Sequence, residues 1–209
     1  MGRQCQEQHF KQQGVGMIEV LVTLFILSIG LLGIASLQFI GTLTNAEALS
    51  RSQAVIVAQQ MSERLRANAV TSNTTIGLVV DNNYFDDDLY NFENLSCATT
   101  ASDFACHCLN HPVSIPNCRN SQCSQAEIAM FDAYELSCSV ASSHPNTRIN
   151  LTCSDNNLLD GDTCSVGSRH SVILKWPVQN WQDNERTLNP ECNVGETEAF
   201  DCVVLDITL

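Results

Sequence analysis

Cysteine is the most reactive side chain that this chain of 209 residues offers in quantity, with eleven copies. Cys5 precedes a long apolar segment, and the other cysteines all follow it. Thiols in an oxidising compartment form disulfides, and an even number of them can pair completely. We therefore expect up to five disulfides, of unpredicted pairing, among the ten cysteines beyond that segment: Cys97, Cys106, Cys108, Cys118, Cys123, Cys138, Cys153, Cys164, Cys192 and Cys202.

Several of these cysteines lie close to histidines, and thiolates and imidazoles are the ligands that zinc prefers. Their spacing is poor for zinc, because the sequence has no Cys-x₂-Cys pair to complement a histidine pair. An oxidising compartment would also consume the thiols first. We therefore favour disulfides, and we predict neither a metal ion nor a cofactor for this cluster: Cys106, His107, Cys108, His111, Cys118 and Cys123.

Two acidic runs, at residues 86–88 and 155–162, supply the oxygen atoms that calcium prefers. The second run resembles a calcium-binding loop only loosely, because Leu159 replaces a ligand and no glutamate stands at the twelfth position. A solvated acidic turn is the simpler interpretation of both runs.

Enzyme motifs are absent from the sequence. It contains no Gly-x-Ser-x-Gly, His-Glu-x-x-His or Cys-x-x-Cys run and no phosphate-binding loop. His107, His111, His144 and His170 are scattered rather than grouped with a nucleophile. We predict that the chain is not an enzyme; a membrane-anchored extracytoplasmic enzyme or binding domain is the alternative of a different class.

The net charge of the chain argues against one further class of partner. Ten Lys and Arg residues against 23 Asp and Glu residues give a net charge of −13, which argues against a nucleic-acid partner. The hydrophobic content of 44% is typical of a globular chain.

The apolar segment that divides the cysteines comprises 27 consecutive uncharged residues, 20–46. As a helix it would extend about 40 Å, more than the ~30 Å core of a bilayer. It is too long for the apolar part of a secretory signal, even though Ala35 resembles a signal-peptidase cleavage site. Arg3 and Lys11 outweigh Glu7 ahead of it, which favours a cytoplasmic N-terminus and an external remainder.

Helix-forming residues continue after this segment, from Thr44 to Ala69, and an apolar stripe recurs there every three or four residues. We therefore predict one helix of about fifty residues, which ends before the turn-forming residues 71–75. The stripe consists of Ala54, Val57, Met61 and Leu65, and the other faces carry Arg51, Glu63, Arg64 and Arg66.

The remaining residues predict an α+β head. Residues 71–123 are polar and lack periodicity, which indicates a loop region held by disulfides. Residues 124–136 predict a short helix, because Ser124 and Glu127 have the spacing of a capping box. Alternating apolar residues predict antiparallel strands at 149–153, 170–176 and 202–209.

One acidic side chain, Glu19, stands at the edge of the apolar segment, five positions after Gly14. Gly14, the largely apolar residues after it, Glu19 and the long apolar run together resemble a class III signal, the N-terminus of type IV prepilins. The resemblance implies that prepilin peptidase cleaves after Gly14 and that Val15 becomes the N-methylated first residue. Glu19 would then neutralise the terminal amine of a neighbouring subunit. A carboxylate snorkelling to the membrane surface is the alternative for Glu19.

The end of the long helix, residues 58–68, is similar to that of PilV-type minor pilins, as are Phe131–Tyr134 and the strand 172–176. This implies a type IV pilin-like α+β fold, in which a long N-terminal helix, its first half spanning the membrane, packs on a small antiparallel sheet. It also implies a minor pilin that primes assembly at the fibre tip. Its partners would be other minor pilins, the major pilin, prepilin peptidase and a PilY-type tip adhesin. A minor pseudopilin of a type II secretion system shares the N-terminus and is the closest alternative.

The resemblance divides the chain into four parts. Residues 1–14 would be a leader peptide, 15–43 the transmembrane and assembly half of the helix, 44–70 its extramembrane half and 71–209 the disulfide-rich head. The protein would be held in the inner membrane with a periplasmic head, and would then become part of an extracellular pilus.

Overall fold

The computed structural model describes residues 16–97, 102–144, 146–160, 162–178 and 187–209. The chain forms two compact units with their boundary between Glu47 and Ala48. The second unit contains the head.

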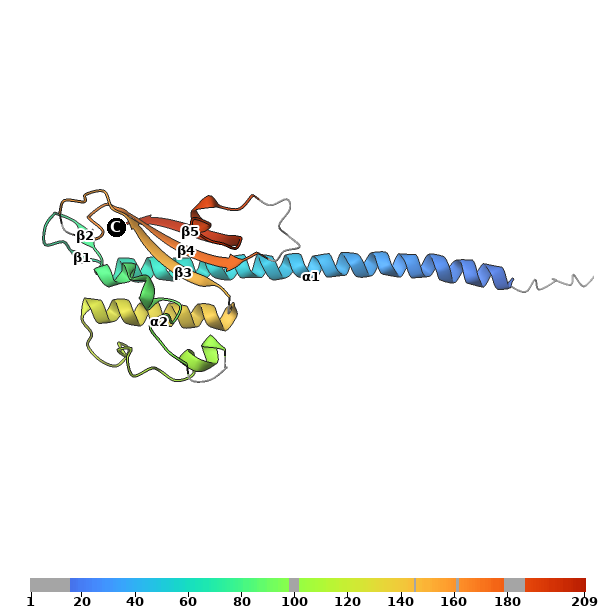
Figure 1. The fold of residues 1–209 in the computed structure, drawn as a ribbon, viewed down its shortest axis with the longest axis horizontal. Coiled ribbons are helices and arrows are strands. Elements are labelled where there is room, and N and C mark those ends of the chain that lie inside the picture. The colour runs from blue at the N-terminus through green and yellow to red at the C-terminus, as the bar shows by residue number, and fades with distance from the viewer. Residues whose placement is uncertain (1–15, 98–101, 145, 161, 179–186) are drawn as a thin grey trace, which may run out of the picture. The chain divides into compact units, whose positions relative to one another are not determined.

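The first element, α1, is a single helix of 51 residues, Met17–Ala67, which confirms the predicted length (Figure 1). The predicted stripe is buried, and Met61 and Leu65 are completely inaccessible to solvent. The helix ends slightly earlier than its residue types predict. The reason is that Val70 already pairs with Val79 in a short hairpin.

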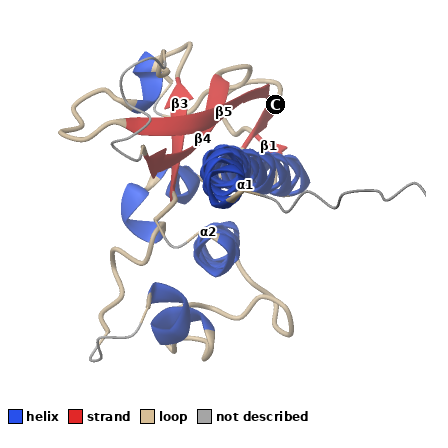
Figure 2. Cartoon of the chain, turned by 90° about the vertical axis from the view of Figure 1, so that its right-hand side faces the viewer, coloured by secondary structure: helices blue, strands red, loops and turns tan. Residues whose placement is uncertain are grey.

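The head contains one antiparallel sheet in the order β3-β4-β5, made by Arg148–Ser154, Arg169–Pro177 and Phe200–Thr208. All three predicted strands are confirmed. Leu151 pairs with Val172, and Val172 pairs with Leu205, so the apolar residues of the three strands share one face. Within the head, the second half of α1 lies between this sheet and helix α2 (Figure 2).

Helix α2, Gln125–Ser143, begins at the predicted capping box. The backbone N–H of Ser124 donates to Glu127 at 2.7 Å, and the backbone N–H of Glu127 donates to Ser124 Oγ at 3.3 Å. The predicted end near Leu136 is wrong, because the helix continues to Ser143. The extra turns bury Val140 in the core, and no glycine or proline occurs between Ser124 and Pro145 to stop them.

The segment expected to be loop, residues 71–123, is more regular than its composition predicts. It includes the hairpin of β1 (Val70–Thr71) and β2 (Leu78–Val79), tight turns at Asn82–Phe85 and Asp87–Leu89, and a π-type turn at Phe104–Cys108. Tyr84 and Tyr90 are fully buried in it. These two aromatic side chains belong to the main core and fix the turns against it.

Asn91 extends the sheet by one side chain. Its Nδ2 donates to the carbonyl of Ile149, and its Oδ1 accepts from the Ile149 N–H, both at 2.8 Å. The amide thereby satisfies backbone groups on the outer edge of β3, as a neighbouring strand would. The backbone of Asn91 has a φ of 53°, a conformation that asparagine tolerates better than most residues.

Candidate functional site

The predicted cleavage and methylation residues, Gly14 and Val15, lie outside the described residues. Glu19 stands in the first turn of α1, and its backbone N–H donates to the carbonyl of Gly16 at 2.9 Å. A carboxylate there is favoured by the free N–H groups and partial positive charge of a helix start. The structure thus places the acidic side chain at the very start of the apolar helix.

The apolar half of α1 meets the length and composition of a membrane span, with a mean hydropathy of 2.6 over its best window and none of that window buried. Its hydroxyl groups bond back to the helix itself: Thr23 donates to the Val20 carbonyl at 2.9 Å, and Ser28 to the Phe25 carbonyl at 2.7 Å. Because these polar groups are already paired, they add little to the cost of placing the helix in lipid.

A buried polar network joins the end of α1 to α2. Asp132 of α2, only 5% exposed, accepts hydrogen bonds from Tyr84 Oη at 2.6 Å and Asn68 Nδ2 at 3.0 Å. The guanidinium of Arg64 also contacts Asp132 and donates to Glu135 at 2.7 Å. Residues 58–68, singled out by their resemblance, therefore hold the head onto the helix through Arg64 and Asn68, which lie one turn apart.

This network shifts the protonation of its members. Burial alone lowers the pKa of Arg64, but the hydrogen bonds and charges of Glu135 and Asp132 outweigh it, so the pKa is raised. Burial, reinforced by Asp132, raises the pKa of Tyr84 far above its usual range. Arg64 therefore stays charged and Tyr84 stays a hydrogen-bond donor at every physiological pH.

Arg51 links α1 to the sheet, in addition to the network that links α1 to α2. Its Nη2 donates to both carboxylate oxygens of Asp201 on β5, at 3.0 and 2.8 Å. The sequence placed Arg51 and Arg64 on the faces away from the apolar stripe but did not reveal that both have carboxylate partners in the head.

The ten cysteines of the head form five disulfides. Four bridges close short or intermediate loops, and the longest joins residues 30 positions apart. The pairs are Cys97–Cys106, Cys108–Cys138, Cys118–Cys123, Cys153–Cys164 and Cys192–Cys202.

These bridges bear on the zinc alternative. Cys106, Cys108, Cys118 and Cys123 are each bonded to another cysteine, so none of them is a thiolate in this structure. His107 is 6% exposed and its ring stacks on Phe92 at a centroid distance of 4.8 Å. The histidine thus packs in the core of the loop region.

The acidic run at residues 155–162 uses its carboxylates internally. Asp155 accepts hydrogen bonds from the backbone N–H of Ser165 at 3.0 Å and from Ser168 Oγ at 3.1 Å. Hydrogen bonds from Ser165 first, and then from Asn157 and Ser168, lower the pKa of Asp155 to about 2. Asp160 accepts from Ser165 Oγ at 3.0 Å. These carboxylates therefore organise a loop.

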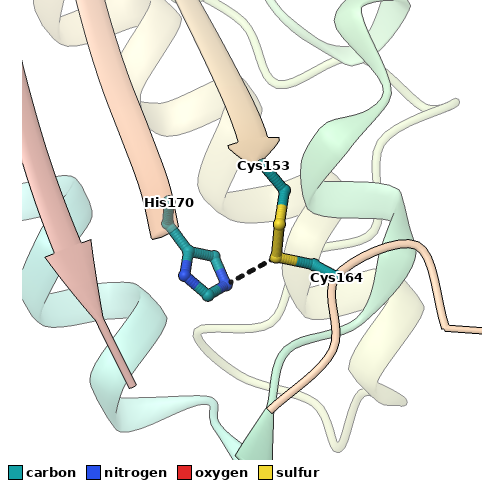
Figure 3. Close-up of side chains that lie close together, drawn as sticks. All are labelled: Cys153, Cys164 and His170. Carbon is teal, nitrogen blue, oxygen red and sulfur yellow. Dashed lines mark hydrogen bonds between the residues drawn. A yellow bond between two sulfur atoms is a disulfide. The ribbon is translucent and has the colours of Figure 1, made fainter. Parts of the chain in front are cut away.

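One histidine contact was not foreseen. His170 Nε2 lies 3.3 Å from Cys164 Sγ, beside the Cys153–Cys164 bridge (Figure 3). A disulfide sulfur carries no hydrogen, so the proton of this contact is on Nε2, and burial lowers the pKa of the imidazole. Three potential metal ligands meet here within 4.8 Å, but both sulfurs are used by the bridge. The pairing of β3 with β4 brings Cys153 opposite His170, a register that the sequence alone does not specify.

A groove of about 740 Å³ opens between α1, α2 and the loop after Cys108. Arg64, Arg119 and Glu135 line it as an ion-paired group, in which Arg119 Nε donates to Glu135 at 2.7 Å. His111 lies edge-on against Tyr134, at a centroid distance of 5.1 Å. The cysteines in its wall, Cys108 and Cys138, are bonded to each other, so they do not provide a free nucleophile.

The comparisons with known proteins give information on the N-terminal part of the chain. Residues 9–35 match the prokaryotic N-terminal methylation motif. No curated protein and no solved structure gives a significant match. The matched motif is the signal of type IV pilins and pseudopilins, which indicates a structural protein. The chain therefore carries the N-terminal signal of a type IV pilin or pseudopilin, which makes it a substrate of prepilin peptidase with a membrane-anchoring helix.

Proposed function

We propose that this protein is a minor pilin of a type IV pilus. Prepilin peptidase would remove residues 1–14 by cleaving between Gly14 and Val15, and Val15 would then be N-methylated. The observation that carries the proposal is the methylation motif at residues 9–35, which overlaps the start of the 51-residue helix α1, whose apolar half is exposed along its length.

The proposed topology follows from charge and cysteine chemistry. Arg3 and Lys11 favour a cytoplasmic N-terminus, with residues 15–43 in the inner membrane. The head would then face the periplasm, an oxidising compartment in which five disulfides persist. Residues 44–70 would connect the membrane to the disulfide-rich head, residues 71–209.

Assembly would be driven by packing and by one charge pair. In the membrane, Glu19 would be an unpaired carboxylate close to lipid, which is costly. Within a bundle of like helices it would meet the amine of Val15 on a neighbouring subunit. Each charge would relieve the cost of burying the other, so only the register that brings them together would be stable.

The assignment to the PilV type is supported by residues 58–68. The four-residue spacing of Arg64 and Asn68 allows both side chains to bond to Asp132 of α2. By this resemblance the protein would join other minor pilins and the major pilin at the fibre tip, in company with a PilY-type adhesin. The N-terminal match fits a minor pseudopilin of a type II secretion system equally well.

Intact mass spectrometry of the protein purified from its native membrane tests the processing step. The expected mass begins at methylated Val15 and rises on reduction by two hydrogens for each of five bridges. Gly14→Ala adds a Cβ where the peptidase binds the chain, and should leave an inserted, unprocessed precursor. Gly16→Ala is the matched control and should be processed normally. A full-length mass for the unaltered protein, or one that begins after Ala35, would contradict the proposal.

Genetic removal of each assembly system separates the two assignments. A minor pilin is expected in sheared pilus fractions, and deleting the pilus assembly ATPase should remove it from them. If the protein instead is absent from pili, and its loss blocks type II secretion without affecting pili, the pseudopilin assignment is correct.

A further inference from the structure

Two loops at one end of the head expose large aliphatic side chains almost completely. Ile76, Leu158 and Leu159 have relative exposures of 103%, 86% and 96%. Ile76 belongs to the turn between β1 and β2, and the two leucines belong to the loop between β3 and β4; both loops lie at the same end of the head (Figure 1). We refer to these three residues as the apolar tip.

The two loops are joined to each other. Asp162 Oδ2 accepts hydrogen bonds from Thr74 Oγ1 at 3.1 Å and from Ser72 Oγ at 3.4 Å. Gly77 has a φ of +150°, and a Cβ at this position would lie 2.1 Å from Cγ1 of Val166. Only glycine allows this close approach, which holds the loop that carries Ile76 against the loop that carries Leu158 and Leu159.

The loop that carries the leucines is internally fixed. The Cys153–Cys164 disulfide closes it, and Asp155 and Asp160 each accept hydrogen bonds from the segment near Ser165. The backbone N–H of Leu159 itself donates to Asn157 Oδ1 at 3.3 Å. Leu158 and Leu159 are therefore exposed beside residues that these bonds hold in place, and a preorganised apolar anchor loses little conformational entropy on binding.

The charges around the apolar tip select its partner. The two loops, residues 70–81 and 154–168, contain Asp81, Asp155, Asp160 and Asp162 but no lysine or arginine. The negative charge of these two loops disfavours contact with the anionic surface of a membrane and with the same loops of a second copy. The same charge favours contact with a surface edged by basic residues, since complementary potentials favour association.

We propose that the apolar tip docks into an apolar pocket, edged by lysine or arginine, on a different protein. A contiguous group of exposed apolar side chains marks an interaction site for a protein or a membrane, and the negative charge of the two loops disfavours the membrane. The proposal does not require the long helix to assemble into a pilus.

Site-specific photo-cross-linking tests this contact in the cells that produce the protein. The full-length chain would carry p-benzoylphenylalanine in place of Leu159, or in place of Val113 as a control that is equally exposed, at 104%, on another loop. We expect the Leu159 probe to form an adduct with one different protein, at a peptide that contains apolar residues flanked by lysine or arginine. The Val113 probe should not form this adduct.

A second set of variants tests which side chains matter. Leu158→Ser and Ile76→Ser, combined with the Leu159 probe, should each reduce the adduct by about tenfold, the size expected for an anchor residue. Val113→Ser should leave it unchanged. All these positions are exposed, so the variants should fold, and the intact mass of their five bridges verifies this.

Four outcomes would overturn the proposal: no adduct, an adduct with lipid, an adduct with a second copy of the chain, or the same adduct from both probes. Failure of the proposed function is distinguishable from these outcomes. A protein that is not cleaved after Gly14 would contradict the minor pilin assignment, yet the Leu159 adduct would still support docking at the apolar tip.

Discussion

At the scale of single residues, two carboxylates lie near the ends of α1: Glu19 is in its first turn, and Asp132 of α2 contacts Arg64 and Asn68 at its other end. Asp132 has its partners within the chain, Tyr84, Asn68 and Arg64. Glu19 is exposed at the start of an apolar helix, and by our proposal its partner comes from another subunit. The two sites therefore predict different defects when the carboxylate is removed.

Glu19→Ala should not affect insertion of the precursor but should reduce its incorporation into pili by about tenfold or more, because an ammonium group would be left unpaired among apolar helices. Quantitative immunoblotting of membrane and sheared pilus fractions measures this ratio. Glu63→Ala, which removes an exposed carboxylate paired with Arg66, is the control and should incorporate normally. Equal incorporation of both variants would refute the pairing of Glu19.

Asp132→Ala should lower the free energy of unfolding of the head by about 3 kcal/mol, because it leaves Tyr84 and Asn68 without their acceptor in the interior. Arg64 keeps its bond to Glu135, which limits the loss. Urea unfolding of the full-length protein in detergent gives the value. Arg66→Ala, at an exposed ion pair, should change it by less than about 0.5 kcal/mol. Similar values for the two variants would show that the buried network contributes little.

At the scale of elements, periodicity in the sequence predicts the helices and strands whose buried face is determined by side-chain spacing within the segment itself. The stripe of α1, the three strands of the sheet and the capping box of α2 all follow from side-chain spacing. The loop region was predicted less well, because Tyr84 and Tyr90 are buried by tertiary packing and have no periodic neighbours. The end of α2 was misplaced for the same reason, since the burial of Val140 extends it.

The residues of the candidate site likewise divide into those that the sequence identifies and those that only the tertiary structure reveals. The sequence identified Gly14, Val15 and Glu19 because their signal is a contiguous motif. It did not identify the partners of Arg64 or the contact of His170 with Cys164, since these depend on which strands and helices become neighbours. Disulfide pairing belongs to this second group, because many pairings are compatible with ten cysteines.

The capping box of α2 allows a test at this scale. Ser124→Ala should lower the free energy of unfolding by about 1 kcal/mol. Backbone and side-chain hydrogen bonds from Ser124 lower the pKa of Glu127 below its usual value of 4.5. The contribution of the ionised Glu127 to stability is therefore present above that pH and is lost as the pH falls. The difference between wild type and Ser124→Ala should therefore shrink below pH 4.5. Ser142→Ala, near the other end of α2, should show no such dependence in the same urea titrations.

At the scale of the whole molecule, the disulfides contribute according to the length of chain that they close. Cys108–Cys138 spans 30 residues and Cys118–Cys123 only 5. By loop-closure entropy, replacing the first pair with alanines should cost about 3.6 kcal/mol and replacing the second about 2 kcal/mol. Thermal or urea unfolding of the two double variants compares these losses. A larger loss for the shorter loop would mean that strain or packing, not chain entropy, determines the effect.

All five bridges lie after residue 96, and none includes a residue of α1. In a filament of such subunits, the only covalent connection between α1 and the head would be the backbone that continues after Ala67. Along the second half of the helix, axial load would be carried by non-covalent contacts: the Asp132 network, the Arg51–Asp201 pair and the apolar core. The disulfides would keep each head intact under tension without strengthening its attachment. Under load, the non-covalent contacts between α1 and the head would therefore yield before the backbone breaks, and a reducing agent would leave them in place.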